Sequence, residues 1–533
     1  MSGTLFSGRE FDRRRVLHSG AGLLALLAPA RARAQSRRGG TLTVATQGEP
    51  RTLVPLLDTN TQTRNISTKI VEGLLTYDRQ FTPQPLLATA WTVSADGLAY
   101  TFTLRRGVTW HDGREFTAED VQFSLLTLQK HGPRGRISFA AINRVETPDP
   151  HTAIVRLSKP TPYFLKALSA AESPIVPKHA YPSDDIGASP NNNAPVGSGP
   201  FIFGEWKRDS YIRLRRNPNY WRPDRPYLDG VVVKFVGDAA AASTALETCE
   251  ADVSGFVALP DLERLSQNEK LVVASERDAY LNNAEVLEFN LDNPNLARRE
   301  VRHAIAHAID RDFIRQWIYY GRAEPIESPI PAVLSTYYDP TSFRFGFDVK
   351  QANRLLDEAG ILRGGDDNRF SLRLTFIPGA AFKKTAEFIR QALSRIGIKV
   401  DVIEGDLGTF IKSVYYDRSF DLNVNGLGLL FDPTVGVQRI YWSDGIRHPL
   451  PYVNAAHYDN PAVDDLFRRA SVEIDESSRA AQFKQIQNIV GQDLPAFPLV
   501  ALQTVTVSNR RVHDLYNSVD LTAGDFSDTW LDP

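Results

Sequence analysis

The second half of the chain alternates short apolar segments with amphipathic ones, and this alternation narrows the possible folds more than any other feature. The predicted order is strand 372–376, helix 384–396, strand 398–403, helix 407–415 and strand 422–424. The first helix carries Phe388, Ala392 and Ile396 on one face and ends before Gly397. Two parallel strands need a long crossover, which is usually a helix. The order therefore predicts an α/β lobe with a mostly parallel sheet.

A hairpin strand, a turn and a helix start lie close together in residues 89–125. Apolar and polar residues alternate along the strand, with Tyr100, Phe102 and Leu104 at the apolar positions. Thr117 is followed three residues later by Asp120, which is the spacing of a capping box at the start of a helix. The segment therefore predicts a half-buried strand followed by an N-capped helix.

Two pairs of residues could suggest catalysis or metal binding. His111 and Asp112 are adjacent, but a structural turn packed on the sheet is the favoured interpretation. His303 and His307 have the i, i+4 spacing of zinc ligands, although the Glu that zincins place after the first His is absent. A solvated or half-buried helix face is favoured for them. Because the sequence has no GxSxG motif, phosphate-binding loop or paired cysteines, no catalytic residue, metal or cofactor is assigned.

The first 34 residues have the features of an export signal. Arg13 and Arg14 precede apolar residues as in a twin-arginine signal, and a weakly apolar run follows at 20–30. The run is too short to span a bilayer. An A-x-A site predicts cleavage after Ala34, and export by either the Tat or the Sec route stays open. Because Gln35 rather than Cys follows the site, no lipid anchor is expected.

Charge and cysteine content exclude several classes of protein. The formal charge of the chain is −2, and the leader carries six Arg against two acidic residues, so the mature chain is near −6 (−2 − 4). This charge argues against nucleic-acid binding, which needs a basic surface. Cys249 is the single cysteine, so no intrachain disulfide can form. It lies in the Ala-rich run 239–251, where we expect a buried apolar role within a helix.

Several motifs occur in one order along the chain and together resemble a known family. They are the segment 89–125, VGSGPF at 196–201, NPNYW at 217–221, FNLDNP at 289–294, EVRHAIAHAIDRDFI at 300–314 and ANRLLDEAG at 352–360. The chain resembles the family 5 extracytoplasmic solute-binding proteins of ABC importers, which take dipeptides, oligopeptides, opines or nickel chelates. The resemblance covers nearly the whole mature chain.

This resemblance implies a periplasmic-binding-protein-like fold of class II, with two lobes, a hinge and three domains. The expected division is a signal peptide at 1–34, domain I at 35–85, 196–286 and 496–533, domain II at 86–195 and domain III at 287–495. Domain II is then an extra domain inserted into domain I. The chain is expected to cross between the lobes near 280–290 and again near 490–500.

The resemblance also implies a function without chemistry. The expected protein is a monomeric periplasmic receptor that captures a peptide or related small organic solute by lobe closure. It would deliver this solute to an ABC permease pair with two ATPases. Two alternatives stay open at this point, namely a ligand-sensing protein that serves a signalling receptor and, less favoured, a periplasmic hydrolase.

A departure from the family pattern concerns the ligand. In the peptide receptors an Asp three positions before an Asp-Pro turn binds the ligand's α-ammonium, and here that position is Leu429, before Asp432 and Pro433. The turn Asp432 is expected to cap the next helix. We therefore expect an apolar or uncharged ligand group beside this loop, with Glu49 as an alternative partner for a cation. The predicted ligand-binding residues are Glu49, Asn425, Gly426, Leu427, Gly428, Leu429, Phe431, Tyr441 and Trp442.

Overall fold

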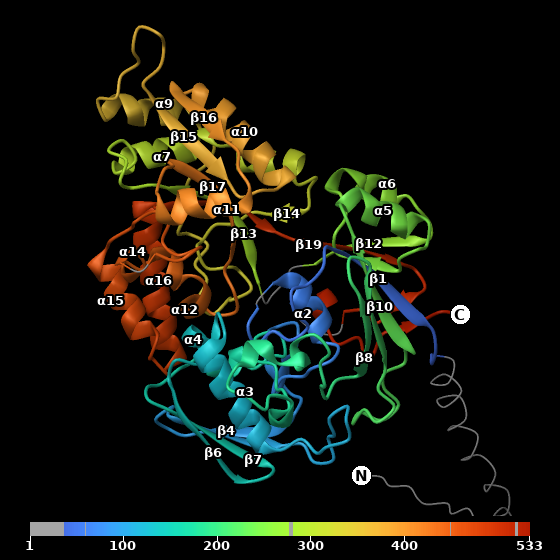
Figure 1. Cartoon of the computed structure of the whole chain (residues 1–533). Helices are drawn as coiled ribbons and strands as arrows, with labels where there is room; N and C mark the ends of the chain where they lie inside the picture. Colours follow the sequence, from blue (N-terminus) through green and yellow to red (C-terminus); the bar gives the residue numbers. More distant parts are fainter. Residues whose placement is uncertain (1–36, 59, 277–280, 448, 517–520) are drawn as a thin grey trace, which may run out of the picture.

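The computed structural model describes residues 37–58, 60–276, 281–447, 449–516 and 521–533. The predicted leader at 1–34 lies outside this part of the chain. The described residues form two lobes (Figure 1). Lobe A holds the seven-stranded and four-stranded sheets. Lobe B holds the six-stranded sheet and the helices that cover it. Among the described residues, no helix is both long and apolar enough to cross a bilayer.

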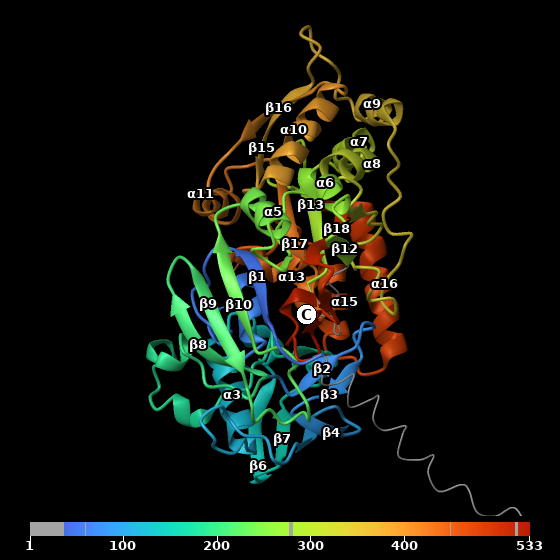
Figure 2. The same ribbon diagram turned by 90° about the vertical axis from the view of Figure 1, so that its right-hand side faces the viewer.

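The main sheet of lobe A is built around the first strand of the described chain. Its order is β12 (Leu271–Glu276), β19 (Thr504–Asn509), β11 (Val253–Ser254), β1 (Thr41–Gln47), β10 (Gly230–Val236), β9 (Tyr211–Arg216) and β8 (Phe201–Lys207). β1 pairs in parallel with β10 on one side and with β11 on the other. One face of the sheet is covered by α5 (Ala239–Glu247) and α6 (Leu262–Ser266), and Figure 2 shows β8, β9 and β10 side by side.

The other face of this sheet shares its core with a smaller subdomain at the bottom of Figure 1. Its four-stranded sheet has the order β4 (Ala88–Val93), β5 (Ala99–Leu104), β7 (Thr152–Leu157) and β6 (Ile142–Asp149). The helix α3 (Ala118–His131) packs against β6 and β7. Asp120 accepts a hydrogen bond from the backbone N–H of Thr117 at 3.0 Å, so the predicted helix start is confirmed. A short hairpin of β2 (Leu75–Tyr77) and β3 (Pro83–Pro85) and the helix α2 (Thr61–Ser67) connect the two sheets.

Lobe B contains the predicted strand–helix alternation. Its sheet has the order β14 (Ala323–Glu324), β18 (Ala496–Leu502), β13 (Asn283–Phe289), β17 (Leu422–Gly428), β15 (Phe370–Phe376) and β16 (Ile398–Ile403). The helices α10 (Ala380–Ser394) and α11 (Leu407–Ile411), the latter continued by the π-turn η7 (Lys412–Tyr416), confirm the two predicted helices. The prediction of a mostly parallel sheet is wrong, since only β15 with β16 and β17 is parallel. β13 and β18 carry the chain into and out of the lobe, so they run antiparallel to each other.

Helices cover both faces of the lobe B sheet. On one face lie α7 (Arg299–Ala308), α9 (Val349–Glu358) and α10, and on the other lie α15 (Pro461–Ala470) and α16 (Glu476–Asp493). Short helices follow β17: α12 (Pro433–Gly436), α13 (Gln438–Tyr441) and α14 (Asp444–Arg447). Two more turns, α8 (Arg311–Phe313) and η6 (Ile314–Ile318), lie beside α10 and β14.

The lobes are joined by two neighbouring crossings. One runs from β12 to β13, between Glu276 and Asn283, and the other passes through Gln503 between β18 and β19. β12 pairs antiparallel with β19 in lobe A, and β13 pairs antiparallel with β18 in lobe B. Residues 283–286 and 496–502 are strand residues of the lobe B sheet. The division into three domains itself stays a prediction.

Two local expectations are wrong. A helix was expected to run through 239–251, but α5 ends at Glu247 and Cys249 is exposed. Cys249 has a φ of 61°, a left-handed conformation, and lies in the turn between α5 and β11. The Ala-rich composition predicts helix correctly but does not show where the helix ends.

A buried ion pair fixes the turn after β17. Asp432 caps α12 by accepting a hydrogen bond from the N–H of Thr434 at 2.9 Å, as predicted. Its carboxylate also binds Arg479 of α16 through two bonds of 2.7 and 2.9 Å, and both side chains are almost fully buried. Burial alone would raise the pKa of Asp432, but the Arg479 guanidinium holds it below its ordinary value. The pair ties the β17 loop to the long helix of lobe B.

Replacing Arg479 by Met is expected to lower the free energy of unfolding by about 3–5 kcal/mol, because it leaves a buried carboxylate without its partner. Urea unfolding followed by circular dichroism measures the loss. The matched control is Arg469→Met, which removes an exposed ion pair with Asp465 on α15 and should cost less than about 1 kcal/mol. Equal losses in the two variants would contradict the structural role given to Arg479.

Candidate ligand-binding site

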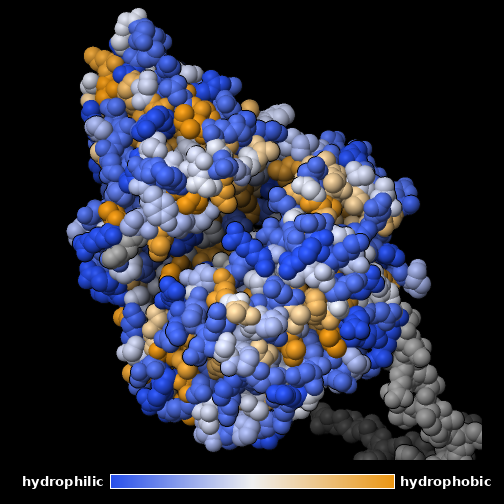
Figure 3. Space-filling model, in the orientation of Figure 1, coloured by the Kyte–Doolittle hydropathy of each residue, from blue (hydrophilic) through white to orange (hydrophobic). Residues whose placement is uncertain are grey.

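A large cavity of the described residues lies between the lobes, next to the two crossings. Its volume is about 610 Å³. Figure 3 shows a hollow at the centre of this face, where the lobes meet, with hydrophobic residues along it. Lobe A contributes most of the wall, and the start of β13 with the crossing at 502–505 closes the other side. Because the cavity borders both crossings, its shape changes with any rotation of one lobe on the other.

Three segments of lobe A form the wall of this cleft. They are the end of β1 at 44–47, the helix α2 with the residue before it, and the loop 255–259 after β11. Since β1 and β11 are parallel neighbours, their carboxyl ends emerge at the same edge of the sheet, where ligands bind in open α/β sheets. Lys69 closes the inner end, with its Nζ donating to the carbonyl of Gly524 at 2.6 Å and lying 4.0 Å from the centre of the Phe526 ring.

The polar lining of the cleft consists mainly of carboxamides. Gln47, Asn60, Gln62 and Asn65 come from lobe A, and Asn283 and Gln503 come from the crossings. The two cationic side chains are Arg64 and Lys69. Among the described lining residues there is no carboxylate. The apolar part of the wall includes Phe256, Leu259, Leu281 and Phe526.

Glu49 lies near the end of β1 but is engaged elsewhere. Its carboxylate accepts hydrogen bonds from Arg208 at 3.2 Å and from the backbone N–H of Asp209 at 3.4 Å. Arg208 in turn lies over the ring of Trp206. In this arrangement Glu49 stabilises the turn between β8 and β9.

The ligand-binding residues predicted in β17 and in the segment after it are mostly inside the protein. Asn425 is completely buried and donates to Glu288 at 2.9 Å and to the hydroxyl of Tyr415 at 2.8 Å. Leu427 and Tyr441 belong to the lobe B core, and Trp442 is half-buried at the end of α13. Leu429 is also buried, and it borders a small pocket of about 30 Å³ beside Asn283.

Two glycines of β17 lie close to neighbouring groups. A Cβ at Gly426 would lie 2.9 Å from the ring of Phe382, and one at Gly428 would lie 3.4 Å from the carbonyl of Leu281. Phe431 crosses to lobe A, where its ring stacks 6.0 Å from Phe81. The loop therefore connects the lobes, and its role as a ligand contact stays a prediction.

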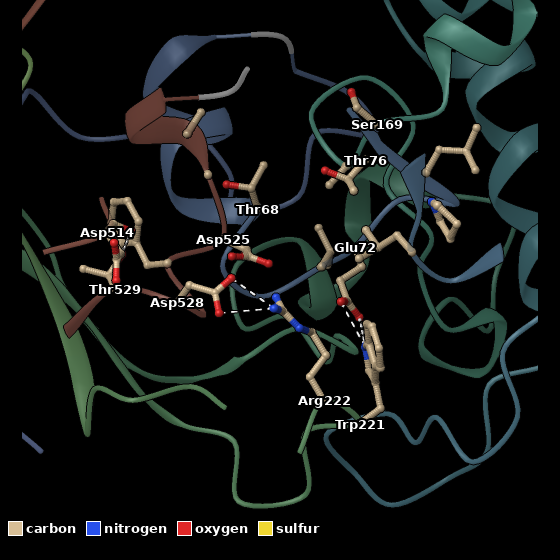
Figure 4. A pocket seen from close by; sticks show the side chains of 18 of the residues that line it. Thr68, Glu72, Thr76, Ser169, Trp221, Arg222, Asp514, Asp525, Asp528 and Thr529 are labelled. Atoms are coloured by element: carbon tan, nitrogen blue, oxygen red, sulfur yellow. Dashed lines mark hydrogen bonds and ion pairs between the residues drawn. The ribbon is translucent and has the colours of Figure 1, made fainter. Parts of the chain in front are cut away.

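A second cavity, of about 370 Å³, lies within lobe A (Figure 4). Glu72, between α2 and β2, is fully buried beside it and accepts hydrogen bonds from Ser198, Tyr220 and Trp221 at 2.8 to 3.1 Å. Arg222 binds Asp528 of the C-terminal segment through bonds of 3.0 and 3.2 Å. Sequence reasoning missed Glu72, although two of the motif segments, at 196–201 and 217–221, supply its partners. The Glu72 carboxyl therefore holds these two motif segments next to each other.

The histidines of the two pairs considered from the sequence make hydrogen bonds within the fold. His111 accepts from the N–H of Gly197 at 3.2 Å and donates to the carbonyl of Gly199 at 3.0 Å, and burial lowers its pKa to about 4. This confirms the structural interpretation of the turn. His303 and His307 bond to backbone carbonyls and pack on Phe345. Within the described ranges no group of three or more His, Cys, Asp or Glu could hold a metal ion.

Two more carboxyl groups are buried in lobe B. Burial raises the pKa of Glu285 to about 8, where the hydroxyls of Thr385 and Tyr319 lie near it and only partly lower it. Burial likewise raises the pKa of Glu288 to about 7, although Asn425 and Asn423 donate to it. Glu72 of lobe A has a pKa raised to about 7 by the same cause. These three groups are expected to make the stability of the protein depend on pH near neutrality.

Comparison with known proteins gives consistent matches. The family model "Bacterial extracellular solute-binding proteins, family 5 Middle" matches residues 82–447, more than half of the chain. Di/tripeptide-binding protein 2 of Pseudomonas aeruginosa is 28% identical over 540 residues, covering 96% of this chain and 98% of the relative.

Solved structures match over nearly the whole length as well. The periplasmic binding protein DppA from Helicobacter pylori, in complex with the peptide STSA, is 27% identical with a TM-score of 0.78 and covers 94% of this chain and 100% of its own. NikZ from Campylobacter jejuni, in complex with Ni(L-His), is 25% identical with a TM-score of 0.77, covering 90% of this chain and 96% of its own. The class II two-lobed fold is therefore confirmed, while the ligands of these proteins differ in chemistry.

The unfolding free energy is expected to fall as pH rises from about 6.5 to 8. The folded-state pKa values of Glu72, Glu285 and Glu288 lie above the ordinary 4.5, so their contribution is complete below that value and is lost through pH 7 to 8. His111 acts in the opposite sense, but only below about pH 6.5. Glu285→Gln should flatten the decrease in melting temperature over this range, whereas the exposed control Glu263→Gln should not. A variant that keeps the full slope would contradict the assignment to Glu285.

Proposed function

This chain belongs to the bacterial extracellular solute-binding proteins of family 5, and we propose that it is the periplasmic receptor of an ABC importer for a peptide or related small organic solute. The observation that carries this proposal is the cleft of about 610 Å³ at the two crossings. A solute bound there contacts both lobes, so it favours the closed arrangement by its additional contacts. The di/tripeptide-binding relative and the DppA structure support the class of ligand.

The partners follow from this role. A closed receptor presents both lobes together to a permease pair, which two ATPases drive. The receptor itself needs no catalytic step, and its task is to bind, close and release. Export across the inner membrane places it in the periplasm, with the leader removed after Ala34.

A sensory role on the same fold is the second candidate. A receptor that signals needs the same cleft and the same closure, and it differs only in the protein that reads the closed state. Stimulation of the importer's ATPase activity by the closed receptor separates the two roles. A hydrolase is disfavoured because the cleft lining of the described residues combines carboxamides and cations with no paired nucleophile and base.

Small-angle scattering tests the closing motion. The ligand is first identified by mass spectrometry of material released from the natively purified receptor, and it is then added back to the stripped protein. The radius of gyration is expected to decrease at saturation, because lobe B can rotate on lobe A about the two crossings. A saturating ligand that leaves the radius unchanged would count against closure.

Export is tested separately. If the twin-arginine pair is read by the Tat system, Arg13→Lys combined with Arg14→Lys should trap the precursor in the cytoplasm, as seen by fractionation. The control is Arg9→Lys, outside the pair. Normal export of the unaltered protein in a Tat-deficient host would show instead that the Sec route carries it.

A further inference from the structure

We propose that the interlobe cleft selects a ligand through hydrogen bonds from carboxamide side chains to uncharged groups, rather than through an ion pair with a terminal ammonium. The inference rests on the proposed function, because it names the ligand class of the same cleft. The ligand would carry several neutral donors and acceptors, such as blocked or internal peptide amides or the hydroxyls of a sugar.

On the lobe A side, four carboxamides are available to a ligand. Asn60 occupies the N-cap position of α2, yet its side chain makes no capping bond, although Asn is among the preferred caps. Gln62 and Asn65 are three residues apart on α2, so they lie on one face of the helix, and both are half-buried. Gln47 is exposed at the end of β1. All four side chains line the cleft.

The crossings supply two more carboxamides on the facing side. Asn283 begins β13 and lines the cleft. Gln503 is the residue at which the chain passes from β18 to β19, and its Nε2 donates to Glu324 at 2.8 Å. This bond orients the Gln503 amide and leaves its oxygen as an acceptor. A ligand that bonds to α2 and to Asn283 or Gln503 is therefore held by groups on both sides of the hinge.

Two carboxylates that could bind an ammonium are already engaged. Glu49 binds Arg208 and the backbone of Asp209, and Asp432 is paired with Arg479 inside lobe B. At the position where the peptide receptors carry their ammonium-binding Asp, this chain has the buried Leu429. Lys69 is held by Gly524 and Phe526. Carboxamides offer a donor and an acceptor in one group, which complements amides and hydroxyls.

An array of neutral hydrogen bonds has a distinct response to salt. Ion pairs accessible to solvent weaken as ionic strength rises, whereas bonds between uncharged groups are nearly unaffected. It also has a distinct response to ligand modification, since acetylation of a terminal amine removes the ammonium but keeps the amide. Salt dependence and terminal blocking therefore separate the two modes of recognition.

Calorimetry on the mature receptor uses three probes: N-acetyl-trialanine amide, free trialanine and the disaccharide sucrose. Binding of the blocked peptide or of sucrose, with an affinity that changes less than about twofold between 20 and 500 mM NaCl, is the expected result. The peptide and sugar arms distinguish the two sources of neutral groups. Tight binding of free trialanine that is lost on acetylation would overturn the proposal, as would the absence of binding by both neutral probes.

Variants locate the binding to the carboxamides. Gln62→Met and Asn65→Leu keep the side-chain volume and remove the hydrogen bonds, and each is expected to weaken binding of the active neutral probe at least tenfold. The matched control Gln267→Met removes an exposed carboxamide after α6 and should leave the affinity unchanged. Melting temperatures verify that the variants remain folded. Unchanged affinity in both cleft variants would overturn the assignment.

The test of the ligand class can be distinguished from the test of the receptor function. If the neutral probe binds and the cleft variants lose it, but the receptor neither compacts nor stimulates a permease, the proposed function fails while the assignment of the ligand class stands. If the receptor compacts around a ligand whose affinity is insensitive to Gln62 and Asn65, the function stands and the carboxamide inference fails.

Discussion

The buried carboxyl group of Glu72 is the interaction on which the arrangement of lobe A depends. An isolated carboxylate inside a protein is costly, so its surroundings must supply donors. Here they come from Ser198, Tyr220 and Trp221, which lie more than a hundred residues away along the chain. These bonds hold the turn at 196–201 and the segment at 217–221 against the end of α2. Since α2 forms a wall of the cleft, the position of this one carboxyl group bears directly on the binding site.

Lobe B is built as a separate body around its own two-faced sheet. Its contacts with lobe A include the paired crossings and the β17 loop, which places Phe431 on Phe81. The ion pair of Asp432 with Arg479 fixes that loop from within lobe B. A receptor that opens must separate the second contact while keeping the first. The loop is therefore both the expected ligand region and part of the interface between the lobes.

The cleft explains why ligand chemistry varies among proteins of this shape. The fold supplies strand ends and a helix at one edge of the sheet, and the side chains placed there determine what binds. In this chain those side chains are mainly carboxamides on α2 and at the crossings. Asp432 caps α12 as the sequence predicts, and Glu49, the alternative partner for a cation, contacts Arg208 in this structure. No local pattern in the sequence connects Glu49 with Arg208 or Asp432 with Arg479.

The sequence by itself determined the strand–helix alternation of residues 372–424 in lobe B, the capped start of α3 and the membership of the chain in its family. These depend on local periodicity and on motifs that stand together in the chain. Only the tertiary structure decided where the lobes join, since strands 283–289 and 496–502 are assigned by pairing with each other. It also decided that Cys249 is exposed, that Glu72 gathers distant segments and that Asn60, Gln62 and Asn65 face Asn283 across a cleft. Contacts between residues far apart along the chain arise from packing, and a single sequence does not contain that information in any local form.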